Sequence, residues 1–219
     1  MDVIIQMLGW IPPLLEGAKI TISLSIVSLA AGLFLSVFLA LGKISKNKII
    51  SKLCSAYIFF FRGTPLLMQL YFIYYGLPQI NPAWVIPSRF AAAWIAFSLN
   101  SAAYCAEIIR AGIQSINKGQ FEAAKALGMS YGQTMRVIII PQSFRRLLPP
   151  VSNEFIMLLK DVSLVSIIAL SDITKVTRGI SSSSASAMVY IPAMVIYLVI
   201  TALFTYIFNR LEKKFSVYE

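Results

Sequence analysis

The sequence contains no histidine and only two cysteines, and charged residues make up 13% of its 219 residues. Without histidine, neither a Ser–His–Asp nor a Cys–His arrangement can form, which excludes these common nucleophilic catalysts. Cys54 and Cys105 stand singly in or beside apolar runs, without the spacing of a metal or redox site. We therefore expect a chain that is not an enzyme and that holds no metal.

The chain also lacks the GxxxxGK[ST] segment with which P-loop proteins hold nucleotide phosphates. We therefore expect no ATP hydrolysis by this chain itself. Its net charge of +10 would suit a nucleic-acid-binding protein. The basic residues, however, stand at the ends of apolar runs and not on one face, so we expect no nucleic-acid partner.

Long apolar runs are what the sequence has instead, since 58% of its residues are hydrophobic and its mean hydropathy is +0.77. A membrane-spanning helix needs about 20 apolar residues. The runs predict an all-α polytopic membrane protein, a single transmembrane domain over residues 1–219 surrounded by lipid. Its expected spans, about five, cover residues 20–41, 54–77, 90–107, 151–171 and 188–208.

Lysine and arginine are distributed unevenly between the two ends of these spans. The loop before residue 54, the segment 107–150 and the C-terminal tail together carry 13 of them. The opposite side carries four, namely Lys19, Arg89, Lys175 and Arg178. Because basic loops stay in the cytoplasm, we expect the N-terminus outside and the C-terminus inside.

One polar segment, residues 115–150, interrupts the apolar runs. Asn117 can cap a first helix that ends at Gly128, and Ser130 can open a second helix that Pro141 closes. A connection of this length inside a compact protein usually carries function. We therefore expect this segment to be more than a tether between two spans.

The same segment resembles the EAA loop of the membrane subunits of ABC importers. Six positions at the family's intervals carry the resemblance: Glu122, Ala123, Ala124, Gly128, Ile138 and Pro141. One difference is Ile140, where the family usually has leucine. The stretches FFRGTPLLMQL (60–70) and LLKDVSL (158–164) are similar to the polar-amino-acid branch of these permeases. The resemblance implies a type I importer fold in the inner or plasma membrane of a prokaryotic cell.

The resemblance also implies partners. In this family the EAA loop is the coupling helix that docks on an ATP-binding-cassette subunit, and a dimer of that subunit binds ATP and Mg²⁺. The expected coupling residues are Glu122, Ala123, Ala124, Gly128 and Pro141. A second permease copy, identical or related, and an extracellular or periplasmic amino-acid-binding protein complete the expected complex.

Residues 54–77 contain the sequence Arg62-Gly63-Thr64-Pro65. Proline removes a backbone hydrogen bond, so the helix should bend or open here and expose polar groups. An arginine at membrane depth is costly and suggests a functional site. The alternative is an arginine near the cytoplasmic end that extends to lipid phosphates.

Two carboxylates, Glu154 and Asp161, are seven residues apart and therefore share one helix face. Such a face does not meet lipid and should line the bundle interior or a cavity. Asn100 and Tyr104, four residues apart, could line the same path or form interhelical hydrogen bonds. Arg62 could hold a substrate carboxylate, or it could pair with either acid inside the protein.

These observations predict the permease subunit of an ATP-driven importer for polar, cationic amino acids such as arginine, lysine or histidine. The predicted substrate-binding residues are Arg62, Gly63, Thr64, Asn100, Tyr104, Glu154 and Asp161. An ion-coupled secondary transporter, with Glu154 or Asp161 carrying a proton, is the alternative. The short chain and the absence of an inverted repeat argue against it.

Overall fold

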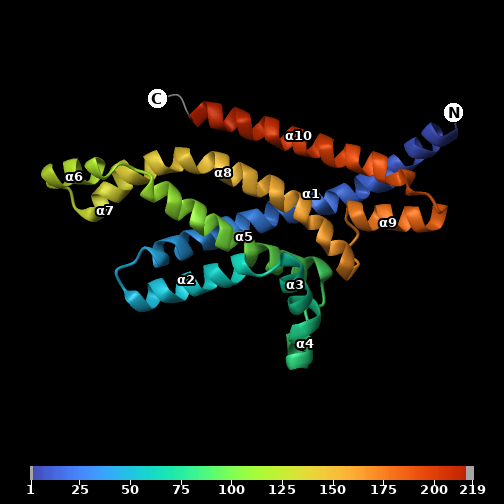
Figure 1. Ribbon diagram of the computed structural model, residues 1–219, viewed down its shortest axis with the longest axis horizontal. Coiled ribbons are helices and arrows are strands. Elements are labelled where there is room, and N and C mark those ends of the chain that lie inside the picture. Colours follow the sequence, from blue (N-terminus) through green and yellow to red (C-terminus); the bar gives the residue numbers. More distant parts are fainter. Residues whose placement is uncertain (1, 216–219) are drawn as a thin grey trace.

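The computed structural model describes residues 2–215, and this part of the chain is helical and contains no strand. Four long helices lie side by side along the molecule (Figure 1): α1 (Asp2–Lys43), α5 (Arg89–Gln114), α8 (Ile140–Asp161) and α10 (Tyr190–Phe215). Helix α1 contacts the other three, so it is the element around which the bundle is assembled.

Helix α1 is longer than the span predicted at residues 20–41. It begins at Asp2 and continues without a break through Pro12 and Pro13. Prolines are tolerated inside membrane helices when neighbouring elements satisfy the freed backbone groups. The described residues before position 20 are therefore part of the first helix.

The predicted break at the Arg62–Pro65 sequence is confirmed. Helix α2 (Lys48–Gly63) ends there, and α3 (Leu66–Tyr71) starts after it at an angle of 102°. Thr64 and Pro65 have extended backbones, with ψ of 146° and 131°. Proline lacks an N–H and keeps the residue before it out of the helical region. Residues 54–77 are therefore two elements at a sharp angle and not one bent helix.

Beyond the break the chain forms an arm that projects away from the four long helices (Figure 1). It continues from α3 through a π-helical turn, η1 (Phe72–Gly76), and α4 (Leu77–Ile80) to a 3₁₀ turn, η2 (Pro82–Trp84). Ser88 then caps α5 by accepting a hydrogen bond from the Ala91 backbone N–H. The third predicted span, residues 90–107, lies within α5.

The polar segment folds as predicted in its first half. Asn117 caps α6 (Lys118–Ala126), and Gly128 follows it with a positive φ of 74°. The Met129 N–H donates to the Ala124 carbonyl, which completes a glycine-terminated helix end.

Its second half differs from the prediction. Ser130 opens α7 (Tyr131–Thr134), as predicted, and forms a capping box with Gln133. The chain then passes through a π-helical stretch, η3 (Met135–Ile139), directly into α8. The prediction that Pro141 closes this helix is wrong, because Pro141 lies in the first turn of α8 and the helical backbone continues through it.

Helix α8 leads into a 3₁₀ helix, η4 (Val162–Ile168), and then α9 (Ile173–Ser184). The run of four serines at positions 181–184 forms the C-terminal end of α9. Asp172 caps α9 by accepting hydrogen bonds from the Thr174 and Lys175 backbone N–H groups. A further 3₁₀ turn, η5 (Ala187–Val189), precedes α10.

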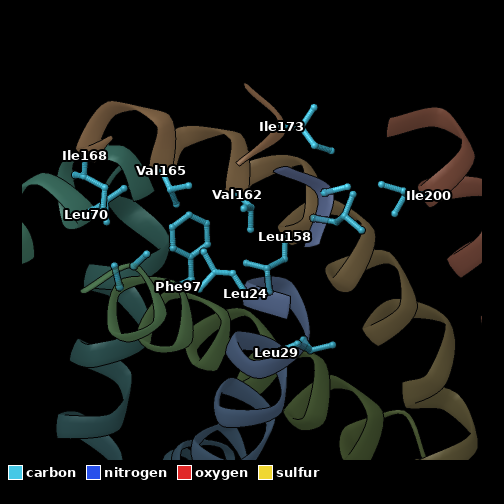
Figure 2. Close-up of a cluster of buried hydrophobic side chains, with 14 of the residues drawn as sticks. Leu24, Leu29, Leu70, Phe97, Leu158, Val162, Val165, Ile168, Ile173 and Ile200 are labelled. Atoms are coloured by element: carbon cyan, nitrogen blue, oxygen red, sulfur yellow. The ribbon is translucent and has the colours of Figure 1, made fainter. Parts of the chain in front are cut away.

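The hydrophobic core lies where α1, α5 and α8 meet the ends of α3, η4, α9 and α10. Figure 2 shows side chains from all seven elements converging there: Leu24, Leu29, Leu70, Phe97, Leu158, Val162, Val165, Ile168, Ile173 and Ile200. Alanines on α5, among them Ala92, Ala93 and Ala96, are fully buried and allow α1 to lie close. The broken segment is therefore anchored to the bundle through α3.

Length and apolar composition identify three helices able to cross a membrane, together with one bent pair. These are Ile5–Lys43, Arg89–Gln114 and Ala187–Phe215, with Lys48–Gly63 and Leu66–Ile80 as the bent pair. Helix α8, which holds most of the predicted span 151–171, is not among them, and it carries Glu154, Lys160 and Asp161. It nevertheless packs between α1, α5 and α10, so a fifth span remains a prediction.

Different helices lie at the two ends of the bundle. Helices α6 and α7 and the C-terminal end of α10 lie at one end, whereas the N-terminal end of α1 and α9 lie at the other (Figure 1). The polar segment and the chain's C-terminal region therefore occupy the same end of the molecule.

One close approach in this bundle depends on a glycine. A Cβ atom added at Gly17 of α1 would lie 2.9 Å from backbone atoms of Asp172 and Ile173. We expect Gly17→Val to lower the unfolding free energy by about 2 kcal/mol, because the backbone of α9 would have to move. The thermal unfolding midpoint of the detergent-purified protein measures this loss.

Gly9→Val is the matched control, because Gly9 lies on the same helix and a Cβ there meets no atom within 4 Å. Equal midpoints for the two variants would contradict the claim that α9 depends on Gly17.

Candidate functional site

An open cavity of about 470 Å³ lies beside the break between α2 and α3. All seven residues predicted to bind substrate line it: Arg62, Gly63, Thr64, Asn100, Tyr104, Glu154 and Asp161. They come from α2, the break, α5 and α8, and the rest of the lining is apolar. The structure brings these residues together, while their binding of a ligand stays a prediction.

The break is held open by two buried amide side chains. The Gln69 amide nitrogen donates to the carbonyls of Phe61 and Thr64, at 2.9 and 3.1 Å, and to the Thr64 hydroxyl at 2.8 Å. The Asn100 amide nitrogen donates to the Phe61 carbonyl and to the Gln69 side-chain oxygen, both at 3.0 Å. These bonds satisfy carbonyl groups that the interrupted helix leaves without intrahelical donors.

Asn100 therefore forms the interhelical hydrogen bond that was one of its two predicted roles. Its amide nitrogen is occupied by Phe61 and Gln69, and its side chain lines the cavity wall. Gln69 was missed by the sequence analysis. The signal was present, since an amide side chain about one turn after a proline in an apolar run needs hydrogen-bond partners when it is buried.

Glu154 and Asp161 both line the cavity, as their shared helix face predicts. Glu154 is half-buried and Asp161 is exposed. In the described part of the chain, neither carboxylate has a lysine or arginine within ion-pair distance. The two carboxylates on the α8 wall of the cavity therefore have no ion-pair partner in direct contact.

Arg62 also lines the cavity, and it forms no ion pair with Glu154 or Asp161, which was one of its two suggested roles. Its guanidinium carbon stands 5.2 Å from the centre of the Tyr104 ring, a cation–π contact. One of its terminal nitrogens lies 3.8 Å from a carboxylate oxygen of Glu107. Both of these contacts join Arg62 to α5.

Glu107 is the centre of a charge cluster that the sequence analysis did not single out. Its carboxylate accepts hydrogen bonds from Lys43 at 2.5 Å and from Arg110 at 2.8 Å. The cluster ties the last residue of α1 and the last turn of α2 to α5. The spacing of Glu107 and Arg110 was visible in the sequence, whereas Lys43 is 64 positions away.

The arrangement can accommodate a zwitterion. The two carboxylates offer a negative wall, and the guanidinium of Arg62 offers a positive edge within the same cavity. Amino acids carry both an ammonium and a carboxylate group, so the charges of the site are complementary to that class of molecule. No group of three His, Cys, Asp or Glu side chains able to hold a metal occurs within residues 2–215.

Four of the predicted coupling residues, Glu122, Ala123, Ala124 and Gly128, lie on or just after α6, whereas Pro141 lies in α8. Glu122 and Ala123 are exposed, whereas Ala124 is buried. Two large apolar side chains, Leu127 and Tyr131, are 79% and 68% exposed beside them. Exposed apolar side chains rimmed by polar groups are typical of protein-binding surfaces.

This surface is held firmly to the bundle. Ile116, Met135 and Ile139 form a small buried cluster beneath it. Arg146 of α8 donates to the Ser115 carbonyl at 2.7 Å, at the C-terminal end of α5. The C-terminal end of α5 is therefore tied to α8 next to this surface, and both helices contribute residues to the cavity.

Comparison with known proteins shows similarity along almost the whole chain. Residues 32–217 match the family described as "Binding-protein-dependent transport system inner membrane component". The arginine transport system permease protein ArtQ of Bacillus subtilis is 41% identical over 93% of each chain. The L-cystine permease TcyB of the same organism is 39% identical, over 98% of this chain and 91% of TcyB. The glutamine permease GlnP of Escherichia coli is 36% identical over 94% of each.

Solved structures give the same result. An amino acid ABC transporter crystallised with histidines contains a chain that is 40% identical, with a TM-score of 0.90 over 96% of this chain and 97% of that one. A chain of the inward-facing MetNI methionine ABC transporter is 17% identical, with a TM-score of 0.72 over 93% of this chain and 94% of that one. This similarity shows a shared fold.

The permeases of this family are not enzymes, and the ATPase is a separate subunit. The helical bundle, the charged cavity beside a broken helix and the extent of these matches lead to one conclusion. The chain belongs to the family of binding-protein-dependent transport system inner membrane components and is the permease subunit of an amino-acid ABC importer.

Proposed function

We propose that this permease carries cationic amino acids and that the cavity at the broken helix is its substrate site. The observation that carries the proposal is the pair Glu154 and Asp161, which line one cavity without a lysine or arginine partner. The similar permeases are named for arginine, cystine and glutamine. The choice of a cationic substrate therefore rests on the charges of the cavity.

Two carboxylates favour a substrate with two positive groups. A carboxylate removed from water needs a counter-ion, because its desolvation is otherwise uncompensated. A neutral amino acid offers one ammonium group and leaves the second carboxylate without a partner. Arginine or lysine offers a second cation, so both Glu154 and Asp161 gain one.

Arg62 has the complementary role in this proposal. Its guanidinium can form two parallel hydrogen bonds with the substrate carboxylate. The extended backbone at Thr64 and Pro65 leaves room at this edge of the cavity, and Gly63 adds no side chain there. Tyr104 keeps the guanidinium oriented through its ring.

The transport cycle follows from the arrangement of the two surfaces. An external amino-acid-binding protein delivers substrate on the side of the N-terminal end of α1. On the cytoplasmic side, Glu122, Ala123, Ala124 and Gly128 contact a dimer of ATPase subunits that binds ATP and Mg²⁺. Pro141 starts the helix that connects this contact to the cavity. A second permease copy, identical or related, encloses the path.

Membership of the ABC importer family removes the alternative of an ion-coupled secondary transporter. Glu154 and Asp161 then act as fixed charges that recognise substrate, and no proton needs to move with it.

Substitution of Glu154 by glutamine tests the substrate site. We expect Glu154→Gln to weaken binding of arginine to the purified complex at least about 30-fold, because removing one partner of a desolvated charge pair costs about 2 kcal/mol or more. Binding of glutamine should change less, since that amino acid has one cation. Equilibrium binding with radiolabelled amino acids gives both values.

Glu16→Gln is the matched control, because Glu16 is paired with Lys19 on the exposed surface of α1. The proposal fails if Glu154→Gln binds arginine as tightly as the Glu16→Gln control does.

Substitution of Gly128 tests the coupling surface. Its φ of 74° lies in the left-handed region, where a β-branched residue is strained by roughly 1–2 kcal/mol. We expect Gly128→Val to reduce amino-acid-stimulated ATP hydrolysis several-fold while arginine binding to the complex stays at the parent value. ATPase activity in proteoliposomes, with binding measured in parallel, checks this.

Gly132→Val provides the comparison, since Gly132 is nearby on α7 and a Cβ there also meets no atom within 4 Å. Stimulated hydrolysis at the parent rate in Gly128→Val would speak against a coupling role for this turn.

A further inference from the structure

A second open cavity, of about 540 Å³, adjoins the substrate cavity toward the α6–α7 end of the molecule. Its lining includes the last two turns of α5 and, on α8, Arg146 and Pro150. Two side chains, Arg62 and Tyr104, line both cavities, and they are the only residues of the described chain to do so. These two side chains therefore stand between the cavities.

The two cavities carry opposite charge. The substrate cavity has two carboxylates, Glu154 and Asp161, against the single guanidinium of Arg62. The second cavity has three arginines against one carboxylate, Glu107; the arginines are Arg62, Arg110 and Arg146. The sign of the charge along the path therefore changes at Arg62.

Arg62 has two contacts at this boundary, one with Tyr104 and one with Glu107. Its guanidinium stacks on the Tyr104 ring at 5.2 Å. Its contact with Glu107, at 3.8 Å, is longer than the 2.5 and 2.8 Å bonds that Lys43 and Arg110 form with the same carboxylate. Lys43 and Arg110 fix Glu107 in place, while the contact with Arg62 is the weakest of the three.

We propose that Arg62 and Tyr104 form a gate between the substrate cavity and an exit cavity, and that Glu107 is the positioning residue that holds Arg62 in this gate. The inference rests on the proposed function, because the substrate carboxylate and Glu107 compete for the same guanidinium. A substrate that binds Arg62 draws it away from Glu107 and so loosens the gate.

The charge of the exit cavity makes it a poor site for a cation. A cationic amino acid that passes Arg62 leaves a negative wall and enters a region lined mainly by arginines. Like charges repel, so this region does not hold the cation. The exit cavity is therefore not a second binding site for a cationic amino acid.

Thiol labelling of the assembled transporter tests the gate. Cys54 and Cys105 are replaced by alanine, and Met157, which lines the substrate cavity, is replaced by cysteine as a reporter. A membrane-impermeant maleimide is added without amino acid from the α6–α7 side, using inside-out vesicles. We expect Arg62→Ala and Glu107→Gln each to raise the labelling rate roughly tenfold, the change for a gate that is otherwise open a tenth of the time.

The controls match these changes in charge and residue type. Arg178→Ala removes an exposed arginine of α9, and Glu16→Gln neutralises a carboxylate of a surface ion pair. Both should label at the parent rate. Tyr104→Leu, which removes the ring from the other half of the gate, should raise the rate as Arg62→Ala does, so that the test does not depend on one variant folding.

The outcomes separate the gate from the proposed function. Parent labelling rates in the Arg62 and Tyr104 variants would overturn the gate, and a parent rate in Glu107→Gln alone would overturn the positioning role of Glu107. Equilibrium binding of radiolabelled arginine to the parent complex tests the substrate site independently of the labelling rates. Arginine binding without rate changes would reject the gate and keep the site, whereas rate changes without arginine binding would reject the site and keep the gate.

Discussion

The hydrogen bonds that Gln69 and Asn100 make across the broken helix are the interaction on which the site depends. A helix interrupted in an apolar environment leaves carbonyl groups that lipid cannot satisfy, and each costs free energy until a donor reaches it. The two amides supply these donors to Phe61 and Thr64. Gln69 joins the two sides of the break, and Asn100, which belongs to α5, joins the break to the bundle. The cavity keeps its shape for this reason.

Structural features that depend on neighbouring residues in the sequence were predicted well. The cap at Asn117, the helix end at Gly128 and the helix start at Ser130 each depend on residues within one turn, and the structure has all three. The break before Pro65 belongs to the same class, because proline acts on its own backbone and on the residue before it. The clustering of seven predicted site residues in one cavity follows from helix periodicity combined with that break.

Features that depend on distant partners were not predicted. Glu107 looked like an ordinary charge at the end of a span, and its contacts with Lys43 and Arg62 arise only when α1, α2 and α5 meet. The continuation of the chain past Pro141 was missed because a π-helical stretch, set by the packing of Met135 and Ile139, precedes the proline. Local proline chemistry allowed either a helix end or a first turn, and tertiary packing decided between them.

The two cavities also show why recognition and release need not be opposed in one permease. A site that binds a cation tightly would hold it indefinitely if the same charges lined the whole path. Here the negative wall belongs to α8, whereas the positive lining beyond it comes mainly from Arg110 and Arg146, on α5 and α8 near the coupling surface. Arg62, in the last turn of α2 before the break, lines both the negative cavity and the positive one. A movement of α5 relative to α8 therefore changes the substrate's electrostatic environment without any residue having to change its charge.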